Sequence, residues 1–139
     1  MRTEQARAAD QVDIARRTAA AWNRGDVEAI VATLAADAEW AIAEENPSAR
    51  LLRGRDEIGE YLADWLSTID GLRYEQSELI DAGQTLISLG TMRGRAGDGP
   101  EVTARLALVS YFDGPLCVRV EEYLDHGRAL VAAGVSTGN

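Results

Sequence analysis

The chain has 139 residues, the size of a single domain with a sizeable core, and 46% of its residues are hydrophobic. Its formal net charge of −9 argues against nucleic acid or an anionic membrane surface as a partner, because like charges repel. The single cysteine, Cys117, excludes an intrachain disulfide, and its apolar surroundings favour a buried side chain. Because residues 1–10 lack the apolar segment of a signal peptide and no run approaches the roughly 20 apolar residues of a membrane span, we expect a cytoplasmic protein.

The first half of the chain has the periodicity of helices. Residues 1 to about 9 are expected to be a frayed lead-in to one domain that spans 1–139. Apolar residues then recur at helical spacing as far as Trp22. Gly25 suits the end of this helix, and Asp26 can cap the next one. Helices are predicted over residues 10–22, 27–34 and 54–70, with a strand over 38–42 and a loop over 44–50.

The second half has the pattern of successive strands joined by short turns. Asp113-Gly114 is a typical hairpin turn between two of them. Because short connections join neighbouring strands, we expect an antiparallel sheet, and helices that precede such a meander indicate the α+β class. Strands are predicted over residues 72–80, 84–95, 102–112 and 116–124, followed by a helix over 126–133.

This order of elements resembles the nuclear transport factor 2-like superfamily, and within it the SnoaL-like group, which includes polyketide cyclases. The resemblance covers most of the chain and is carried by Ala21-Trp22-Asn23-Arg24-Gly25-Asp26, residues 34–40 and 52–58, Asp113-Gly114, and Glu122-Tyr123-Leu124-Asp125 with Ala129-Leu130, Ala133 and Gly134. It implies a cone-shaped α+β barrel, in which a curved antiparallel sheet wraps around three to four helices. It also implies a homodimer and a cone mouth that holds a small apolar or polycyclic ligand.

The resemblance makes Asp125 the first candidate catalytic residue, since an aspartate in the matching motif of polyketide cyclases acts as an acid or base. Enclosure by apolar side chains would raise its pKa toward neutrality. The alternative is that Asp125 caps the last helix through the backbone N–H of Gly127 or Arg128. Tyr123 and Glu121 share its strand face, as a candidate hydrogen-bond donor and a candidate substrate contact. Cross-strand packing is the alternative for Tyr123.

Further candidates would line a pocket for a flat ligand. Four large aromatic residues are candidate walls, and plain core packing is the alternative for them: Trp22, Trp40, Tyr61 and Trp65. Arg105, Leu108 and Ser110 are candidate contacts on the penultimate strand. For Arg105 and its neighbour Arg93, the alternative is a surface ion pair with Glu75 or Glu121, which would contribute under ~1 kcal/mol.

Several residues that act in catalytic relatives of this fold are absent from the sequence. Ketosteroid isomerases of this fold carry a base aspartate in the first strand, where Ile42 stands here, and several cyclase-like relatives carry a pocket-facing histidine in the penultimate strand, which has none here. His126 is the only histidine and is expected to face solvent. With one histidine and one cysteine we expect no metal site, and without a glycine-rich phosphate loop no nucleotide cofactor.

Fold alone leaves the activity open, because the superfamily hosts cyclases, isomerases, dehydratases, epoxide hydrolases and members without a known reaction. We expect a cofactor-independent protein of polyketide or other natural-product metabolism that acts by proton transfer as a cyclase, isomerase or epoxide hydrolase. The alternatives are a noncatalytic carrier of a hydrophobic metabolite and a homodimeric assembly subunit. A cavity of roughly 300 Å³ or more would favour the first two, and fully packed aromatics the last.

Overall fold

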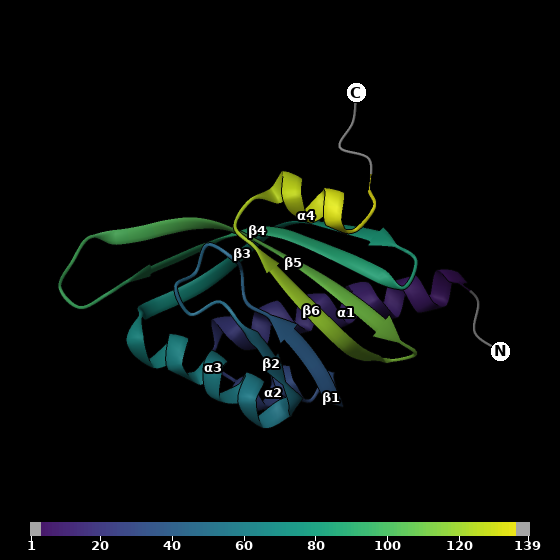
Figure 1. Cartoon of the computed structure of the whole chain (residues 1–139), viewed down its shortest axis with the longest axis horizontal. Helices are drawn as coiled ribbons and strands as arrows, with labels where there is room; N and C mark the ends of the chain where they lie inside the picture. The colour runs from purple at the N-terminus through teal and green to yellow at the C-terminus, as the bar shows by residue number, and fades with distance from the viewer. Residues whose placement is uncertain (1–3, 136–139) are drawn as a thin grey trace.

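The computed structural model describes residues 4–135, in which one six-stranded sheet has helices on both faces (Figure 1). The strands lie in the order β2-β1-β6-β5-β4-β3 across the sheet. In chain order the elements are α1 (Glu4–Asn23), α2 (Val27–Val31), β1 (Leu34–Ala41), β2 (Leu51–Arg53), α3 (Gly54–Thr68), β3 (Asp70–Ala82), β4 (Thr85–Arg95), β5 (Glu101–Asp113), β6 (Leu116–Tyr123) and α4 (His126–Ala132).

The first turn signal acts as predicted. Gly25 has a positive φ of 74°, and the Asp26 carboxylate accepts a hydrogen bond from Ala29 N at 3.1 Å, which caps α2. Helix α1 begins at Glu4, within the segment 1 to about 9 for which a frayed lead-in stays a prediction, and residues 1–3 lie outside the described part. Strand β1 also begins earlier than predicted, at Leu34, where the chain pairs with β6.

The sheet is mixed, which corrects the prediction of a wholly antiparallel one. Strands β3, β4, β5 and β6 form an antiparallel meander, but β1 pairs in parallel with β6, with Trp40 opposite Val120. No short turn joins β1 to β6, so the antiparallel rule for hairpins does not fix their direction. The three residues of β2 pair antiparallel with β1 and are too few to show a strand periodicity in the sequence.

The two faces of the sheet bury two separate hydrophobic clusters. We call the face that α1 to α3 cover the inner face and the face that carries α4 the outer face. The larger one lies between the inner face and helices α1 to α3, and it contains Trp22, Leu34 and Ile58. The smaller one lies on the outer face beneath α4, where Val109 and Ala129 are fully buried. Figure 1 shows α4 on the opposite side of the sheet from α2 and α3.

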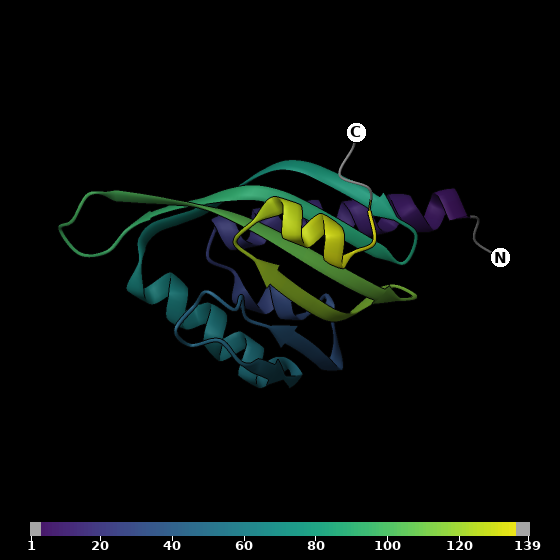
Figure 2. The same cartoon turned by 45° about the horizontal axis from the view of Figure 1, so that its top comes forward.

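The long β4–β5 hairpin projects beyond the other strands (Figure 2). At the middle of β4, a glycine lets an aromatic ring cross the inner face, because a Cβ on Gly90 would lie only 2.6 Å from ring atoms of Tyr74. Within residues 4–135, no helix is both long and apolar enough to span a membrane. The fold thus combines an inner face covered by α1 to α3 with an outer face partly covered by α4.

Candidate functional site

A cavity of about 490 Å³ lies between the inner face of the sheet and the helices. This volume is within the range of sites that hold drug-sized small molecules. Its walls are mainly apolar side chains from α1, α3 and strands β1 and β3 to β6. Trp65, Val102 and Leu124 line it and are 37%, 59% and 38% exposed, so they mark its mouth.

The structure places most of the predicted pocket residues along this cavity. The four aromatic candidates all lie on its wall: Trp22, Trp40, Tyr61 and Trp65. Arg105, Leu108 and Ser110 of β5 lie there as well. Arg93 forms the ion pair expected for it, with Glu75 at 2.7 Å. A direct contact of any of these side chains with a ligand stays a prediction.

Two carboxylates line the cavity: Glu45, which is exposed and pairs with Arg128, and Glu122 of β6, which the protein holds with hydrogen bonds. Trp40 Nε1 donates to Glu122 Oε2 at 2.6 Å, and the Tyr61 hydroxyl donates to the same oxygen at 2.9 Å. The backbone N–H of Ala43 donates to Oε1 at 3.3 Å. Three elements, β1, α3 and the β1–β2 loop, therefore hold this side chain in one orientation.

Burial raises the pKa of the Glu122 carboxyl above its ordinary value, because removal from water disfavours the charged form. The hydrogen bonds from Trp40, Tyr61 and Ala43 lower the pKa, but their effect is smaller than that of burial. All three donors are neutral, and among residues 4–135 no ion pair reaches this carboxylate. A raised pKa makes this carboxyl easier to protonate than an exposed glutamate, which is a direction of shift used by general acids and bases.

The neighbouring aromatic groups complete this end of the cavity. The rings of Tyr61 and Trp65 meet edge to face, with centroids 6.5 Å apart and planes at 89°. Burial and the nearby Glu122 raise the pKa of Tyr61, so its hydroxyl stays protonated and remains a donor. The Glu122 carboxyl thus faces an apolar space enclosed by aromatic side chains.

A second polar group lies on the cavity wall, on strands β3 and β4. The Tyr74 and Ser88 hydroxyls are 2.8 Å apart, and Gln76 Nε2 donates to Ser88 Oγ at 2.9 Å. Tyr74 and Ser88 are buried, at 5% and 6% exposed. Burial raises the pKa of Tyr74 to about 12, so these three side chains are uncharged at neutral pH.

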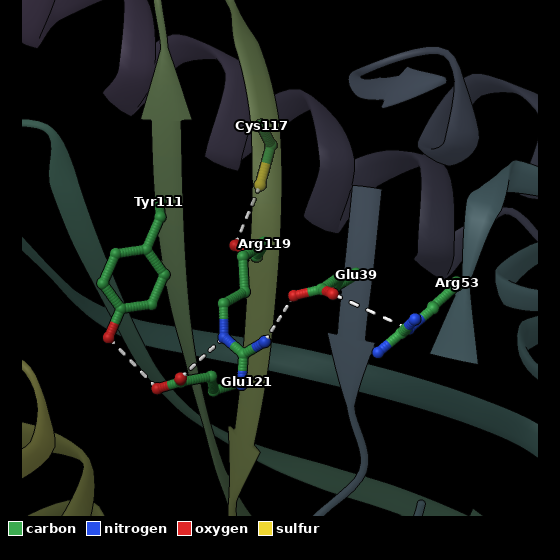
Figure 3. A network of polar contacts seen from close by, with 6 residues as sticks. All are labelled: Glu39, Arg53, Tyr111, Cys117, Arg119 and Glu121. Carbon is green, nitrogen blue, oxygen red and sulfur yellow. Dashed lines mark hydrogen bonds and ion pairs between the residues drawn. The ribbon is translucent and has the colours of Figure 1, made fainter. Parts of the chain in front are cut away.

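Glu121 and Tyr123, both candidates from the sequence, belong to the outer face. The hydroxyls of Tyr111 and Tyr123 donate to Glu121 Oε1 at 3.1 and 2.9 Å, and Arg119 Nε pairs with Oε2 at 2.9 Å. Arg119 also pairs with Glu39 at 2.7 Å, which links β6 to β1 (Figure 3). The hydroxyl of Tyr123 is thus bonded within its own strand, while its ring packs against the outer cluster that includes Ala107, its partner across the sheet on β5, which is the cross-strand packing given as the alternative.

Of the two interpretations of Asp125, the structure shows the helix cap. Its Oδ1 accepts a hydrogen bond from Arg128 N at 3.1 Å, and the residue is exposed. The strand face shared by Glu121, Tyr123 and Asp125 does not line the cavity. At this end of β6 the side chains on the cavity wall are those of Glu122 and Leu124. A chemical role of Asp125 or Tyr123 stays an untested prediction that this geometry does not support.

The side chains of the single histidine and the single cysteine each contact a backbone carbonyl oxygen. His126 Nε2 lies 3.0 Å from the carbonyl oxygen of Gly90, so it is partly buried rather than solvent-facing as predicted. Cys117 lines the cavity, donates to the Arg119 carbonyl at 3.3 Å and is buried, and burial raises its pKa to about 11. Within residues 4–135, no three potential ligands gather in a way that would hold a metal ion.

Sequence reasoning missed Glu122, although the sequence contains a signal for it. A bulge between Cys117 and Arg119 shifts the register of β6, and beyond it the inner positions are Val120, Glu122 and Leu124. An acid between two apolar residues at alternate positions indicates a buried carboxyl. The odd positions from 119 to 125 are occupied only by polar or amphipathic residues, which is typical of a solvent-facing side.

Comparisons with known proteins agree with this architecture. A family model described as the SnoaL-like domain matches residues 15–122, more than half of the chain. A nuclear transport factor 2-like protein of Burkholderia thailandensis E264 is 31% identical, and the match covers 96% of this chain and 97% of that one with a TM-score of 0.74. No match is found among curated proteins.

Two further solved structures share the fold at lower identity. A nuclear transport factor 2-like protein of Burkholderia pseudomallei K96243 is 23% identical, with 88% of this chain and 95% of that chain covered and a TM-score of 0.75. TerC, crystallised with polyporic acid, is 20% identical, with 86% and 94% covered and a TM-score of 0.74. Together with the family match, the curved sheet and its cavity show that the chain belongs to the SnoaL-like domain family of the nuclear transport factor 2-like superfamily.

Proposed function

We propose that the protein binds a mostly apolar, flat small molecule in its cavity and that Glu122 transfers a proton on it. The observation that carries this proposal is a carboxyl with a raised pKa that faces a cavity of about 490 Å³ and has only neutral hydrogen-bond donors around it. A carboxylate that is poorly compensated gains from taking up a proton, which is what a general base does.

The reaction class that fits is cofactor-independent isomerisation or cyclisation. Ionised Glu122 would remove a proton from carbon next to a ligand carbonyl, and the electron pair of that C–H bond would become an enolate. Protonated Glu122 would then return the proton at another atom, which isomerises the ligand. Alternatively, the enolate carbon would attack the carbon of a second carbonyl and close a ring, and as the C=O π bond breaks its oxygen would take the proton from Glu122. Trp40 and Tyr61 donate to Glu122 Oε2 and so fix the orientation of the carboxyl on the cavity wall.

The ligand class is supported by the walls and by one structural relative. The aromatic side chains Trp22, Trp40 and Trp65 give flat apolar surfaces on which a ring system can pack. TerC, which shares the fold, is crystallised with polyporic acid. We therefore propose a ring-containing natural product, of polyketide or similar origin, as the ligand.

The second candidate function is noncatalytic binding of such a molecule. It is favoured by the fact that both Glu122 oxygens already accept hydrogen bonds from the protein, so that the carboxylate can serve as a fixed anchor for Trp40 and Tyr61. An assembly subunit is expected to have fully packed aromatic residues. In the structure these residues line a cavity instead, which does not favour that alternative. A homodimer and a cytoplasmic location stay predictions.

The two candidates are separated by a reaction that needs only a base in an apolar site. In the Kemp elimination, a base removes the C–H proton of 5-nitrobenzisoxazole and the ring N–O bond breaks to give a nitrile and a phenolate. We expect the protein to accelerate this elimination and Glu122→Gln to reduce the rate by about 10²- to 10⁴-fold.

The matched control is Glu121→Gln, which changes the next residue on the outer face and should leave the rate within about 2-fold of wild type, since Glu121 is held by Arg119 away from the cavity. An equal loss of rate in both variants, or no acceleration by the wild type, would contradict the proton-transfer function. Tight binding of the benzisoxazole without elimination would favour the carrier function instead.

A further inference from the structure

Two polar groups of the cavity wall, Glu122 and the cluster of Tyr74, Gln76 and Ser88, are aligned across the sheet. On the inner face, Glu122 of β6 lies opposite Leu108 of β5, and Leu108 lies opposite Ser88 of β4. All three residues line the cavity. Since neighbouring strands are about 4.8 Å apart, the Cα atoms of Glu122 and Ser88 are separated by about 10 Å, with only the apolar Leu108 between them.

The hydrogen bonds of the second group leave part of one side chain free for a ligand. Gln76 Nε2 donates to Ser88 Oγ, the Ser88 hydroxyl can donate to Tyr74, and the Tyr74 hydroxyl donates to the Leu106 carbonyl at 3.4 Å. In this order each hydroxyl donates once and accepts once. The Gln76 amide then still has its carbonyl oxygen and its second N–H, and Gln76 is a partly buried residue of the cavity wall.

This second group is built into the strands and is uncharged. Because Gly90 lacks a Cβ, the Tyr74 ring can lie across β4 and place its hydroxyl against Ser88. An amide that offers one acceptor and one donor matches a hydroxyl or enol, which also both donates and accepts. A carboxylate would find no charge partner among these three side chains, and it would share the cavity with Glu122. Of the two arginines on the cavity wall, Arg93 already pairs with Glu75 and Arg105 is exposed.

On the basis of the function proposed above, we propose that the cavity selects an elongated, neutral ligand with two polar ends. The reacting end lies at Glu122, an apolar ring body crosses Leu108, and a hydroxyl or enol at the far end binds the Gln76 amide. Ser88 and Tyr74 act as positioning residues that hold this amide. The row of Glu122, Leu108 and Ser88 across β6, β5 and β4 would therefore select ligands by their length as well as by their charge.

The test compares two probes that differ by one hydroxyl, 2-naphthol and 2,6-dihydroxynaphthalene, by titration calorimetry. A net hydrogen bond contributes about 1 kcal/mol, so we expect the wild type to bind the dihydroxy probe about 5- to 10-fold more tightly. In Gln76→Leu this preference should fall to within about 2-fold, while the affinity for 2-naphthol stays close to that of the wild type. Thermal unfolding of each variant checks that it is folded.

Two serine variants separate positioning from general damage to the sheet. Ser88→Ala removes the partner of the Gln76 amide and should lower the preference for the dihydroxy probe while that variant remains folded. Ser77→Ala is the matched control, because the Ser77 hydroxyl donates to the Leu89 carbonyl and does not line the cavity, so the preference should be unchanged.

The outcomes distinguish the two proposals. Binding of both probes by the wild type with equal affinity, or an unchanged preference in Gln76→Leu, would overturn the inference about the far end and leave the role of Glu122 intact. Binding of neither probe would contradict the ligand cavity itself, and with it both proposals. Loss of the preference in Ser77→Ala as well would show that the effect does not come from Gln76.

Discussion

Two carboxylates that are adjacent in β6 have opposite surroundings. Glu121 points to the outer face, where Arg119, Tyr111 and Tyr123 bind it. Figure 3 shows the part of this network that runs from Tyr111 through Arg119 to Glu39 and Arg53. Glu122 points to the inner face, where its three donors are neutral and burial raises its pKa. Both residues accept hydrogen bonds from tyrosine, yet only the inner one faces the cavity.

The difference shows which carboxyl is suited to chemistry. The ion pair with Arg119 and the hydrogen bonds from two tyrosines make Glu121 a structural link between strands. Glu122 is held by neutral donors in an apolar site, and burial raises its pKa. The outer side chains of β6 therefore link this strand to β1 and β5, while its inner side presents Glu122 to the cavity.

The largest expected effect on stability concerns the same alternation on β5. Val109 is fully buried beneath α4, whereas Leu108 faces the cavity. Val109→Ala should lower the free energy of unfolding by about 2 kcal/mol, since it removes two buried carbons and leaves a void. Leu108→Ala should cost less although it removes more atoms, because one side of Leu108 already faces empty space. Urea unfolding measures both, and a greater loss in Leu108→Ala would contradict the assignment of faces.

The pH dependence of stability should differ between the wild type and Glu122→Gln. Because the native pKa of Glu122 is raised above 4.5, the stability contributed by its protonated form is complete below pH 4.5 and is lost as the pH rises through the native pKa. The melting temperature of the wild type should therefore fall relative to that of Glu122→Gln above pH 4.5, by an amount on the order of several degrees. Parallel melting curves over this range would argue against a raised pKa.

The smallest effect is expected at the helix cap. Asp125→Ala removes the acceptor for Arg128 N and should lower the free energy of unfolding by about 1 kcal/mol. Asp125→Asn should have little effect on stability, because asparagine is an equally good N-cap residue. Both variants should retain the Kemp elimination rate of the wild type, and loss of that rate in folded Asp125→Asn would return the catalytic role to Asp125.

The fold could be predicted from the sequence largely because its signals are local. Gly25 and Asp26 define a helix end and a cap within a few residues, and Asp113-Gly114 defines a hairpin. The parallel pairing of β1 with β6 has no local signal, since it depends on contacts between residues about 80 positions apart, such as Trp40 and Val120.

The candidate site was predicted in part, for a similar reason. The aromatic walls Trp40 and Tyr61 are large enough to be recognised in any register. The choice between Glu121 and Glu122 depends instead on which strand face turns inward, and the bulge near residue 118 reverses that assignment along β6. The family motif drew attention to Asp125, although the alternation of apolar residues around Glu122 was the better indicator.

The central claim is that Glu122 is an uncompensated carboxyl in the cavity, and its own titration tests this most directly. Carbon-13 NMR of protein labelled at the glutamate carboxyl carbons, with Glu122→Gln to identify the signal, follows the Glu122 carboxyl as the pH is raised. We predict that this signal titrates clearly above the ordinary value of 4.5 in the free protein, because burial outweighs the three hydrogen bonds. A midpoint at or below 4.5 would show a carboxylate stabilised in its charged form and would contradict the account.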